Sequence, residues 1–224
     1  MKKYLETLKS SPLFEHINGE DLVNMLGCIG GAVYTYKKGQ SILCEGDRAD
    51  KIGIVLSGRV QIIRMDYYGN RSILAELGKS QLFGESFACA GINGLPISVV
   101  AVEDSSVMLM DITRIISSCT SACHFHNQMI HNLLRAVSIK NITLNKKIEI
   151  TSQRSTREKL MTYLLMQAKE TGRNSFDIPY DRQELADYLE VERSGLSAEI
   201  SKLRRAGILE SKNNHFILKE KING

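Results

Sequence analysis

The spacing of apolar residues changes near residue 123, and this change constrains the fold more than any other feature of the chain. Before it, from about residue 32 to residue 111, short β-rich runs alternate with turn residues at roughly every ten positions. After it, apolar residues recur at intervals of four and three, the spacing of an α-helix with one narrow apolar seam. We therefore expect a domain of short strands followed by one long helix.

The β-rich segment is expected to form a sandwich or a roll, because many short strands joined by glycine turns favour these architectures. Gly39, Gly46 and Gly58 are among the glycines that separate the runs. Two short helical patterns, at 4–9 and 19–27, precede the strands, and Asn18 is placed to cap the second. The expected strands are 32–36, 41–44, 51–57, 58–65, 71–77, 97–101 and 106–112.

The long helix carries a seam typical of a two-stranded coiled coil. Its residues are Ile130, Leu134, Val137, Asn141, Leu144 and Ile148. A polar Asn141 inside such a seam lowers stability but fixes register and a two-stranded state. The seam therefore predicts dimerisation through this helix. The alternative is a single amphipathic helix that packs on its own domain.

Residues 179–203 have the pattern of a helix-turn-helix. Asp181 is expected to cap the first helix, with Glu184 three residues later. Residues 207–211 and 215–218 flank an asparagine-rich turn, which predicts a two-stranded wing directly behind the motif. The expected inner face consists of Leu185, Ala186 and Leu189, Val191 in the turn, and Leu196, Ile200 and Leu203. Upstream, Ser155 and Glu158 form a second capping box, and Gly172 is expected to end that helix.

The outer face of the second helix is suited to DNA, with its N-terminal turns in the major groove. The expected DNA-contacting residues are Arg182, Gln183, Arg193, Ser194, Ser197 and Lys202. Arg193 can bind a guanine edge or a phosphate, whereas Arg182 and Lys202 are expected to contact the backbone. Gly195 inside the helix costs about 1 kcal/mol relative to Ala. Glu192 is a poor N-cap, and a winged helix that contacts only proteins is the alternative.

With these residues identified, nearly the whole chain resembles the CRP/FNR family of bacterial regulators. The β-rich part carries 36–39 (Tyr-Lys-Lys-Gly), 45–47 (Glu-Gly-Asp), 55–58 (Val-Leu-Ser-Gly) and 83–85 (Phe-Gly-Glu), in an order that resembles the cyclic-nucleotide-binding fold. The resemblance implies an α+β chain: a double-stranded β-helix (jelly-roll) sensor at 1–122, a dimerisation helix at 123–150, and a winged helix-turn-helix at 151–224. It also implies a homodimer on a near-palindromic DNA site, gated by an effector in the roll.

The same resemblance places the effector site at Gly84, Glu85, Ser86, Ile97 and Ser98. Family members that bind cyclic nucleotides have a phosphate-binding arginine where this chain has Ile97. Without a bidentate guanidinium, the cyclic phosphate would enter a half-buried pocket beside Glu85 with its charge unpaired. We therefore expect an effector other than cyclic AMP, and no cofactor is assigned. An alternative of equal weight to the effector site is that Gly84 and Glu85 form a turn that only stabilises the fold.

The cysteines and histidines favour neither an enzyme nor a bound cluster. The iron–sulfur pattern of FNR-type members is absent, since only Cys28 precedes the β-rich part. Cys119, Cys123 and His126 lie at i, i+4 and i+7, so they could sense a metal or an oxidant, but buried thiols are the simpler interpretation and we assign no metal. No histidine occurs between His16 and His124, which excludes a cupin-type histidine cluster.

The composition is that of a cytoplasmic globular protein without a membrane span or signal peptide. The net charge of +4 is too small to indicate nucleic acid by itself. The expected partners are double-stranded DNA and a second copy of the chain. An activator would also need a surface for RNA polymerase, and no residue pattern identifies one. The rival function is a ligand-binding adaptor that does not bind DNA.

Overall fold

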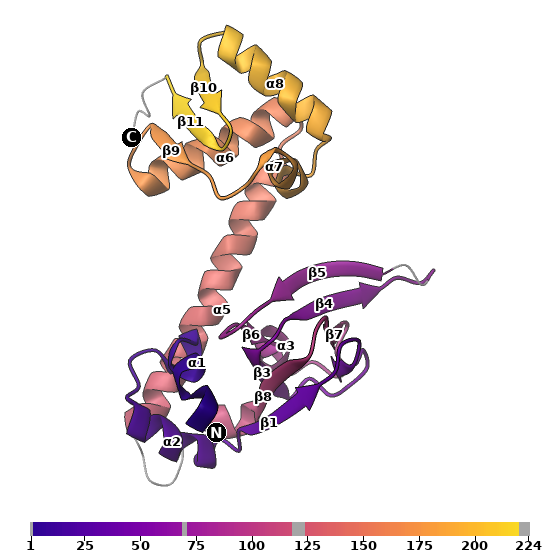
Figure 1. The fold of residues 1–224 in the computed structure, drawn as a ribbon, viewed down its shortest axis with the longest axis vertical. Helices are drawn as coiled ribbons and strands as arrows, with labels where there is room; N and C mark the ends of the chain where they lie inside the picture. Colours follow the sequence, from indigo (N-terminus) through magenta and orange to yellow (C-terminus); the bar gives the residue numbers. More distant parts are fainter. Residues whose placement is uncertain (1, 69–70, 118–123, 220–224) are drawn as a thin grey trace. The chain divides into compact units, whose positions relative to one another are not determined.

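The computed structural model describes residues 2–68, 71–117 and 124–219. These residues form two compact units, one up to Lys140 and one from Asn141 onward. The division falls inside the long helix α5 (His124–Thr151), which runs from one unit into the other (Figure 1). The boundaries at residues 122 and 150 that the sequence suggests therefore stay a prediction.

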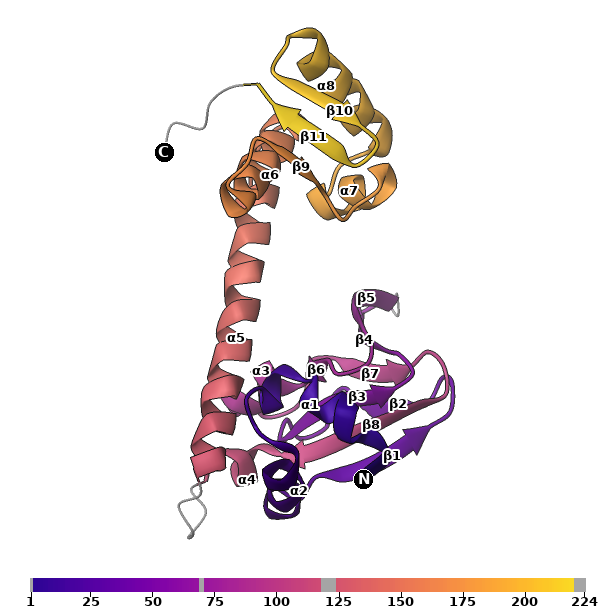
Figure 2. The same cartoon turned by 60° about the vertical axis from the view of Figure 1, so that its left-hand side comes forward.

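Two four-stranded antiparallel sheets form the β-roll of the first unit (Figure 2). In order, one sheet contains β1 (Ala32–Tyr36), β8 (Ser105–Asp111), β3 (Lys51–Ser57) and β6 (Leu82–Phe83), and the other contains β2 (Ser41–Leu43), β7 (Ser98–Ala101), β4 (Val60–Met65) and β5 (Arg71–Leu77). The seven expected strands are confirmed, with ends that differ by no more than two residues. Sequence periodicity missed β6, because two residues are too few to show an alternation.

Short helices pack on the side of the roll that faces α5 (Figures 1 and 2). They are η1 (Lys2–Tyr4), α1 (Leu5–Lys9), η2 (Pro12–Phe14), α2 (Gly19–Cys28), α3 (Glu85–Ala90) and α4 (Ile112–Ile116). Asn18 caps α2 as expected, since its side-chain oxygen accepts the Asp21 N–H at 2.9 Å. Asp111 caps α4 in the same way, by accepting the Thr113 N–H at 2.9 Å.

Strand β3 is buried on both faces and so joins two hydrophobic clusters. Ile52 and Ile54 pack with the N-terminal helices, whereas Val55 packs inside the roll. Gly53 lies under the Phe83 ring, where an added Cβ would come within 2.0 Å of the ring carbon Cζ. Only glycine therefore allows β6 to lie against β3 at this point.

The first half of α5 packs onto the first unit. Met129 and Leu133 belong to the cluster that holds the N-terminal helices. Asn132 is buried, and its side-chain amide donates to the carbonyl oxygens of Leu13 at 3.1 Å and Glu15 at 2.8 Å. These bonds fix the helix against the N-terminal segment.

The second unit is a winged helix. It contains α6 (Thr156–Thr171), β9 (Ser175–Asp177), α7 (Arg182–Leu189), α8 (Arg193–Arg205), β10 (Leu209–Lys212) and β11 (His215–Leu218), with the sheet order β10, β11, β9. The wing strands are confirmed, whereas β9 was not expected. Its core includes Leu164, Leu189, Leu203 and Phe216, all buried, and the end of α5 contributes Ile150.

Both expected capping boxes of the second unit are confirmed. The Ser155 hydroxyl accepts the Glu158 N–H at 3.2 Å, and the Glu158 carboxylate accepts the Ser155 N–H at 3.0 Å. Asp181 and Glu184 make the equivalent pair of bonds at 2.8 and 2.7 Å. Gly172 ends α6 with a left-handed φ of 66°. These caps fix where α6 and α7 begin and where α6 ends.

Two neighbouring leucines of α6 provide a matched test of the core. Leu164 is fully buried, whereas Leu165 is 44% exposed. We expect Leu164→Ala to lower the free energy of unfolding of the second unit by about 2–5 kcal/mol through a cavity. Leu165→Ala should cost less than about 1 kcal/mol. Urea unfolding followed by circular dichroism measures both, and equal losses would show that Leu164 is not a core residue.

The acid stability of the first unit should depend on Asp111. Its bonds to Thr113, and then to Lys51, lower the pKa of Asp111 from 3.8 to about 2. A lowered folded-state pKa adds stability above pH 3.8, and this contribution is lost as the pH falls toward 2. We expect Asp111→Ala to destabilise the first unit by about 1–2 kcal/mol at pH 7, with a smaller difference from the wild type at pH 3. Urea unfolding at the two pH values measures this, and an equal difference at both would contradict it.

Candidate functional site

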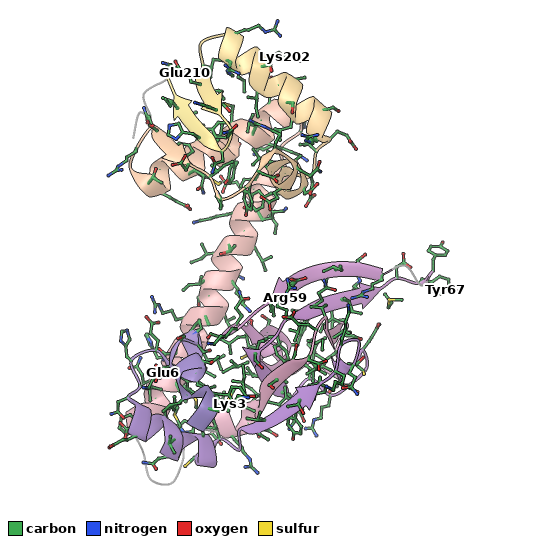
Figure 3. The ribbon with its side chains drawn as sticks, viewed as in Figure 1. Lys3, Glu6, Arg59, Tyr67, Lys202 and Glu210 are labelled. Atoms are coloured by element: carbon green, nitrogen blue, oxygen red, sulfur yellow. The ribbon has the colours of Figure 1, made fainter. Side chains whose placement is uncertain are left out.

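The helix-turn-helix presents one apolar and one polar face. The expected inner residues Leu185, Ala186, Leu189, Leu196, Ile200 and Leu203 are all buried, and Val191 packs partly against them. On the outer face of α8, Arg193, Ser194 and Lys202 are exposed, and Ser197 is half-buried. Figure 3 shows Lys202 on the outside of α8, away from the core of this unit. The structure thus brings four of the six predicted DNA-contacting residues onto one helix.

Arg182 lies between the first helix of the motif and the wing. Its Nη2 donates to the Ser211 hydroxyl and to the Asn213 carbonyl oxygen, both at 3.3 Å, and its guanidinium lies 5.7 Å from the centre of the Phe216 ring. Its Nη1 is buried without a hydrogen-bond partner among the described residues. Burial, and then the neighbouring Arg193 guanidinium, lower the pKa of Arg182. An anion at this position would relieve both effects.

The beginning of α8 is also favourable for an anion. Glu192 is the N-cap but makes no side-chain capping bond, as its poor cap propensity predicts. The first backbone N–H groups of α8 are therefore not satisfied by this cap, and a helix N-terminus favours negative charge. With Arg182 and Arg193 beside it, this end of the helix can hold a phosphate.

Two of the predicted DNA-contacting residues make contacts within their own helices. The Lys202 ammonium lies 3.3 Å from the Glu199 carboxylate, and the Gln183 side-chain amide donates to Asp187 at 2.9 Å. Sequence reasoning assigned no role to Ser211 and Asn213, which hold Arg182. Asn213 is left-handed at the wing turn, with a φ of 56°. Its place in an asparagine-rich turn was the only available signal.

The end of α5 is attached to the back of the motif. The Lys147 ammonium donates to the Tyr188 carbonyl oxygen at 2.5 Å and lies 4.5 Å from the centre of the Tyr188 ring. Tyr188 stacks on Tyr180 at 4.9 Å, and both contact Tyr163. Burial raises the pKa of Tyr163, so this phenol stays neutral. Lys147 therefore links the end of α5 to the end of α7.

The predicted effector residues are held mainly by contacts within the protein. Gly84 has a φ of 80°, and a Cβ there would lie 2.8 Å from the Lys51 carbonyl oxygen, so this turn needs glycine. Glu85 is buried, and its Oε1 accepts the Lys140 ammonium at 2.5 Å. Ile97 is buried inside the roll, and the Ser98 hydroxyl accepts the Glu45 N–H at 2.9 Å. Ser86 is exposed.

Three apolar residues of the predicted dimer seam are exposed and form an apolar stripe on α5. Leu134, Leu144 and Ile148 are 65%, 62% and 61% exposed. Asn141 is exposed, and its oxygen accepts the Asn145 side-chain amide at 2.8 Å. Of the remaining seam residues, Val137 packs partly on the core of the first unit and Ile130 is partly buried.

The group of Cys119, Cys123 and His126, for which buried thiols are the simpler interpretation, is described only at His126, because Cys119 and Cys123 lie outside the described residues. His126 is buried, and its Nε2 lies 2.6 Å from the Ile115 carbonyl oxygen. Within 2–68, 71–117 and 124–219, no group of three or more acidic, cysteine or histidine side chains could hold a metal ion. Over the same residues, no helix is both long enough and apolar enough to span a membrane.

Two family models match the two units. The cyclic nucleotide-binding domain matches residues 33–119, and the Crp-like helix-turn-helix domain matches residues 158–221. These matches cover the β-roll and the winged helix separately, in the order in which they occur along the chain.

Individual relatives agree with this pairing. The "Cyclic AMP receptor protein" of Thermus thermophilus is 31% identical over 103 residues, which are 46% of this chain and 46% of that protein, so the match spans less than half of its length. "Transcriptional activator protein FnrL" of Cereibacter sphaeroides is 21% identical over 199 residues, or 82% of this chain and 75% of that protein. The solved structure of the "c-di-GMP Responsive Global Regulator CLP" of Xanthomonas campestris is 16% identical, covers 91% of this chain and 100% of its own, and has a TM-score of 0.53, which shows the shared fold.

Proposed function

Because the chain belongs to the CRP/FNR family of transcription regulators and carries that family's helix-turn-helix DNA-binding domain, we propose that it is an effector-gated, sequence-specific regulator. In this proposal it acts as a homodimer on a near-palindromic site in the cytoplasm and catalyses no reaction. The supporting observation is the pair of neighbouring guanidinium groups at the starts of α7 and α8, Arg182 and Arg193, which lack a neutralising carboxylate among the contacts described above.

The charge arrangement divides the roles among the DNA-contacting residues. Arg193 stands in the first turn of α8, where it can reach a base edge in the major groove. Arg182 is held by the wing and cannot extend freely, so its role is to bind phosphate. Lys202 lies in the last turn of α8 and forms an ion pair with Glu199. Its role is therefore to attract the DNA by its charge rather than to recognise a base.

Dimerisation is proposed through the exposed stripe on α5. Leu134, Leu144 and Ile148 would each leave water on pairing with a second copy, which is the usual source of stability in a coiled coil. Asn141 within the stripe fixes the register. A two-fold dimer presents two recognition helices about 34 Å apart, and this spacing sets the palindromic site.

The effector is proposed to be something other than cyclic AMP. Ile97 offers no charge for a cyclic phosphate, the Ser98 hydroxyl is bonded to the Glu45 N–H, and Glu85 already holds Lys140. A phosphate placed beside Glu85 would face a buried carboxylate without a matching cation of its own.

The alternative function, a ligand-binding adaptor, would leave the basic face of α8 without a partner.

Selection from random duplexes tests the function directly. We expect the purified dimer to retain a two-fold symmetric sequence. Failure to enrich any sequence, even when a cell extract supplies possible effectors, would favour the adaptor instead. Addition of 1 mM cyclic AMP should change the affinity for the selected site by less than about twofold. A ligand shifts the equilibrium between two states only if it binds one of them more tightly, and we expect no such difference for cyclic AMP. If cyclic AMP alone switches binding on, the account of Ile97 is wrong.

Substitutions on α8 test how the site is recognised. We expect Arg193→Ala to weaken binding to the selected site by about 1–3 kcal/mol and to relax the preference at one base position. Lys202→Ala should weaken binding to all sequences alike, with a shallower salt dependence. Fluorescence anisotropy against single-base variants of the site measures both effects, and Lys38→Ala in the roll removes the same charge as a control. Equal loss on every sequence for Arg193→Ala would show that Arg193 only holds phosphate.

A further inference from the structure

One contact between the roll and α5 involves a buried charge. Glu85, the first residue of α3, has a side chain only 3% exposed, and such burial of a carboxylate is unfavourable unless it is paired. Its Oε1 accepts the Lys140 ammonium at 2.5 Å. Its Oε2 is buried without a hydrogen-bond partner among the described residues. Lys140 is therefore the cation that compensates this buried charge.

Lys140 is held by two groups from one short segment of the roll. Besides Glu85, its ammonium donates to the Leu82 carbonyl oxygen at 3.1 Å. Leu82 is the first residue of β6, and Gly84 makes the turn from β6 into α3. The lysine thus binds the two ends of the Gly84 turn, which is the segment that the family resemblance assigns to an effector.

Helix α5 carries another lysine one heptad later, Lys147, which binds the Tyr188 carbonyl oxygen and ring in the second unit. The helix is continuous between these two positions. Lysines seven residues apart lie on nearly the same face of a helix, because seven residues make almost two turns. Lys140 therefore fixes α5 to the roll, and Lys147 fixes the same helix to the DNA-binding motif.

We propose that Lys140 serves as an internal ligand of Glu85, and that this ion pair is the positioning contact through which the roll holds α5 in its DNA-binding arrangement. This proposal rests on the proposed function and adds the contact at which DNA binding is regulated. An effector acts by strengthening or weakening the contact of Lys140 with the Gly84 turn, so Lys140 is a regulatory residue that touches no DNA. The contact needs no cyclic nucleotide, which agrees with Ile97 in the roll.

A set of full-length variants tests the pair on the duplex selected by the wild type. Lys140→Met and Glu85→Gln should each lower the affinity for that duplex, within the roughly 5–150-fold range of allosteric coupling. The double variant should lose no more than either single one, because both remove the same contact. Lys140→Arg should restore affinity to within about threefold of the wild type, since the cation is retained.

Lys146→Met is the matched control. Lys146 is as exposed as Lys140, at 46%, and makes an ion pair of the same length, but its partner Glu170 is 45% exposed. The control should bind DNA like the wild type, because a surface ion pair contributes little. Sedimentation must show the same oligomeric state for every variant, and Glu85→Gln, which keeps the shape of the side chain, decides the question where Lys140→Met does not fold.

The outcomes separate this proposal from the proposed function. Suppose that the wild type binds its duplex and that Lys140→Met and Glu85→Gln bind it equally well or more tightly. The proposed role of the ion pair is then wrong, whereas the proposed function as a DNA-binding regulator is retained. The same holds if the effects of the two single variants add, or if Lys146→Met loses as much affinity as Lys140→Met. If the wild type selects no duplex, both proposals fail.

Discussion

Helix α5 belongs to two hydrophobic cores at once, and the rest of the structure depends on this. Met129 and Leu133 pack into the core of the first unit, and Ile150 packs into the core of the second. A helix that contributes to both cores cannot shift relative to one of them without a cost in buried apolar surface. The stretch between them carries the exposed stripe that we propose as the dimer seam. The packing of the roll, the proposed dimer seam and the packing of the DNA-binding motif thus share one helix.

Charged side chains are compensated within the protein in the roll but not at the DNA-binding face. In the roll, the buried Glu85 is compensated by Lys140 within the protein. At the DNA-binding face, the Arg193 guanidinium lies close enough to lower the pKa of the partly buried Arg182, and one nitrogen of Arg182 has no partner among the described residues. A site that is neutralised internally has little need of an ionic ligand, whereas neighbouring cations favour a polyanion. This contrast supports DNA as the partner of α8 and argues against a cyclic phosphate in the roll.

Local sequence rules predicted the elements that depend on neighbouring residues. The capping boxes at Ser155 and Asp181, the Asn18 cap and the Gly172 terminus all involve groups within a few residues of one another, so their patterns are visible in the sequence. The inner face of the helix-turn-helix follows from helical periodicity. The rules missed the short strands β6 and β9 and the short helices η2, α3 and α4, which have too few residues to show a period. They also missed Ser211 and Asn213, whose role depends on the position of Arg182.

The sequence alone determined the β-rich segment, the long helix, the winged helix and the polar face of α8, because period and capping are properties of consecutive residues. Only the tertiary structure decided how the predicted effector residues are used. Glu85 and Lys140 are 55 residues apart, and the Ser98 hydroxyl and the Glu45 N–H are 53 apart. Neither contact follows a local pattern, since each forms only when the roll closes and α5 packs against it. Chain folding over these distances gave Glu85 and Ser98 partners within the protein that no local pattern predicts.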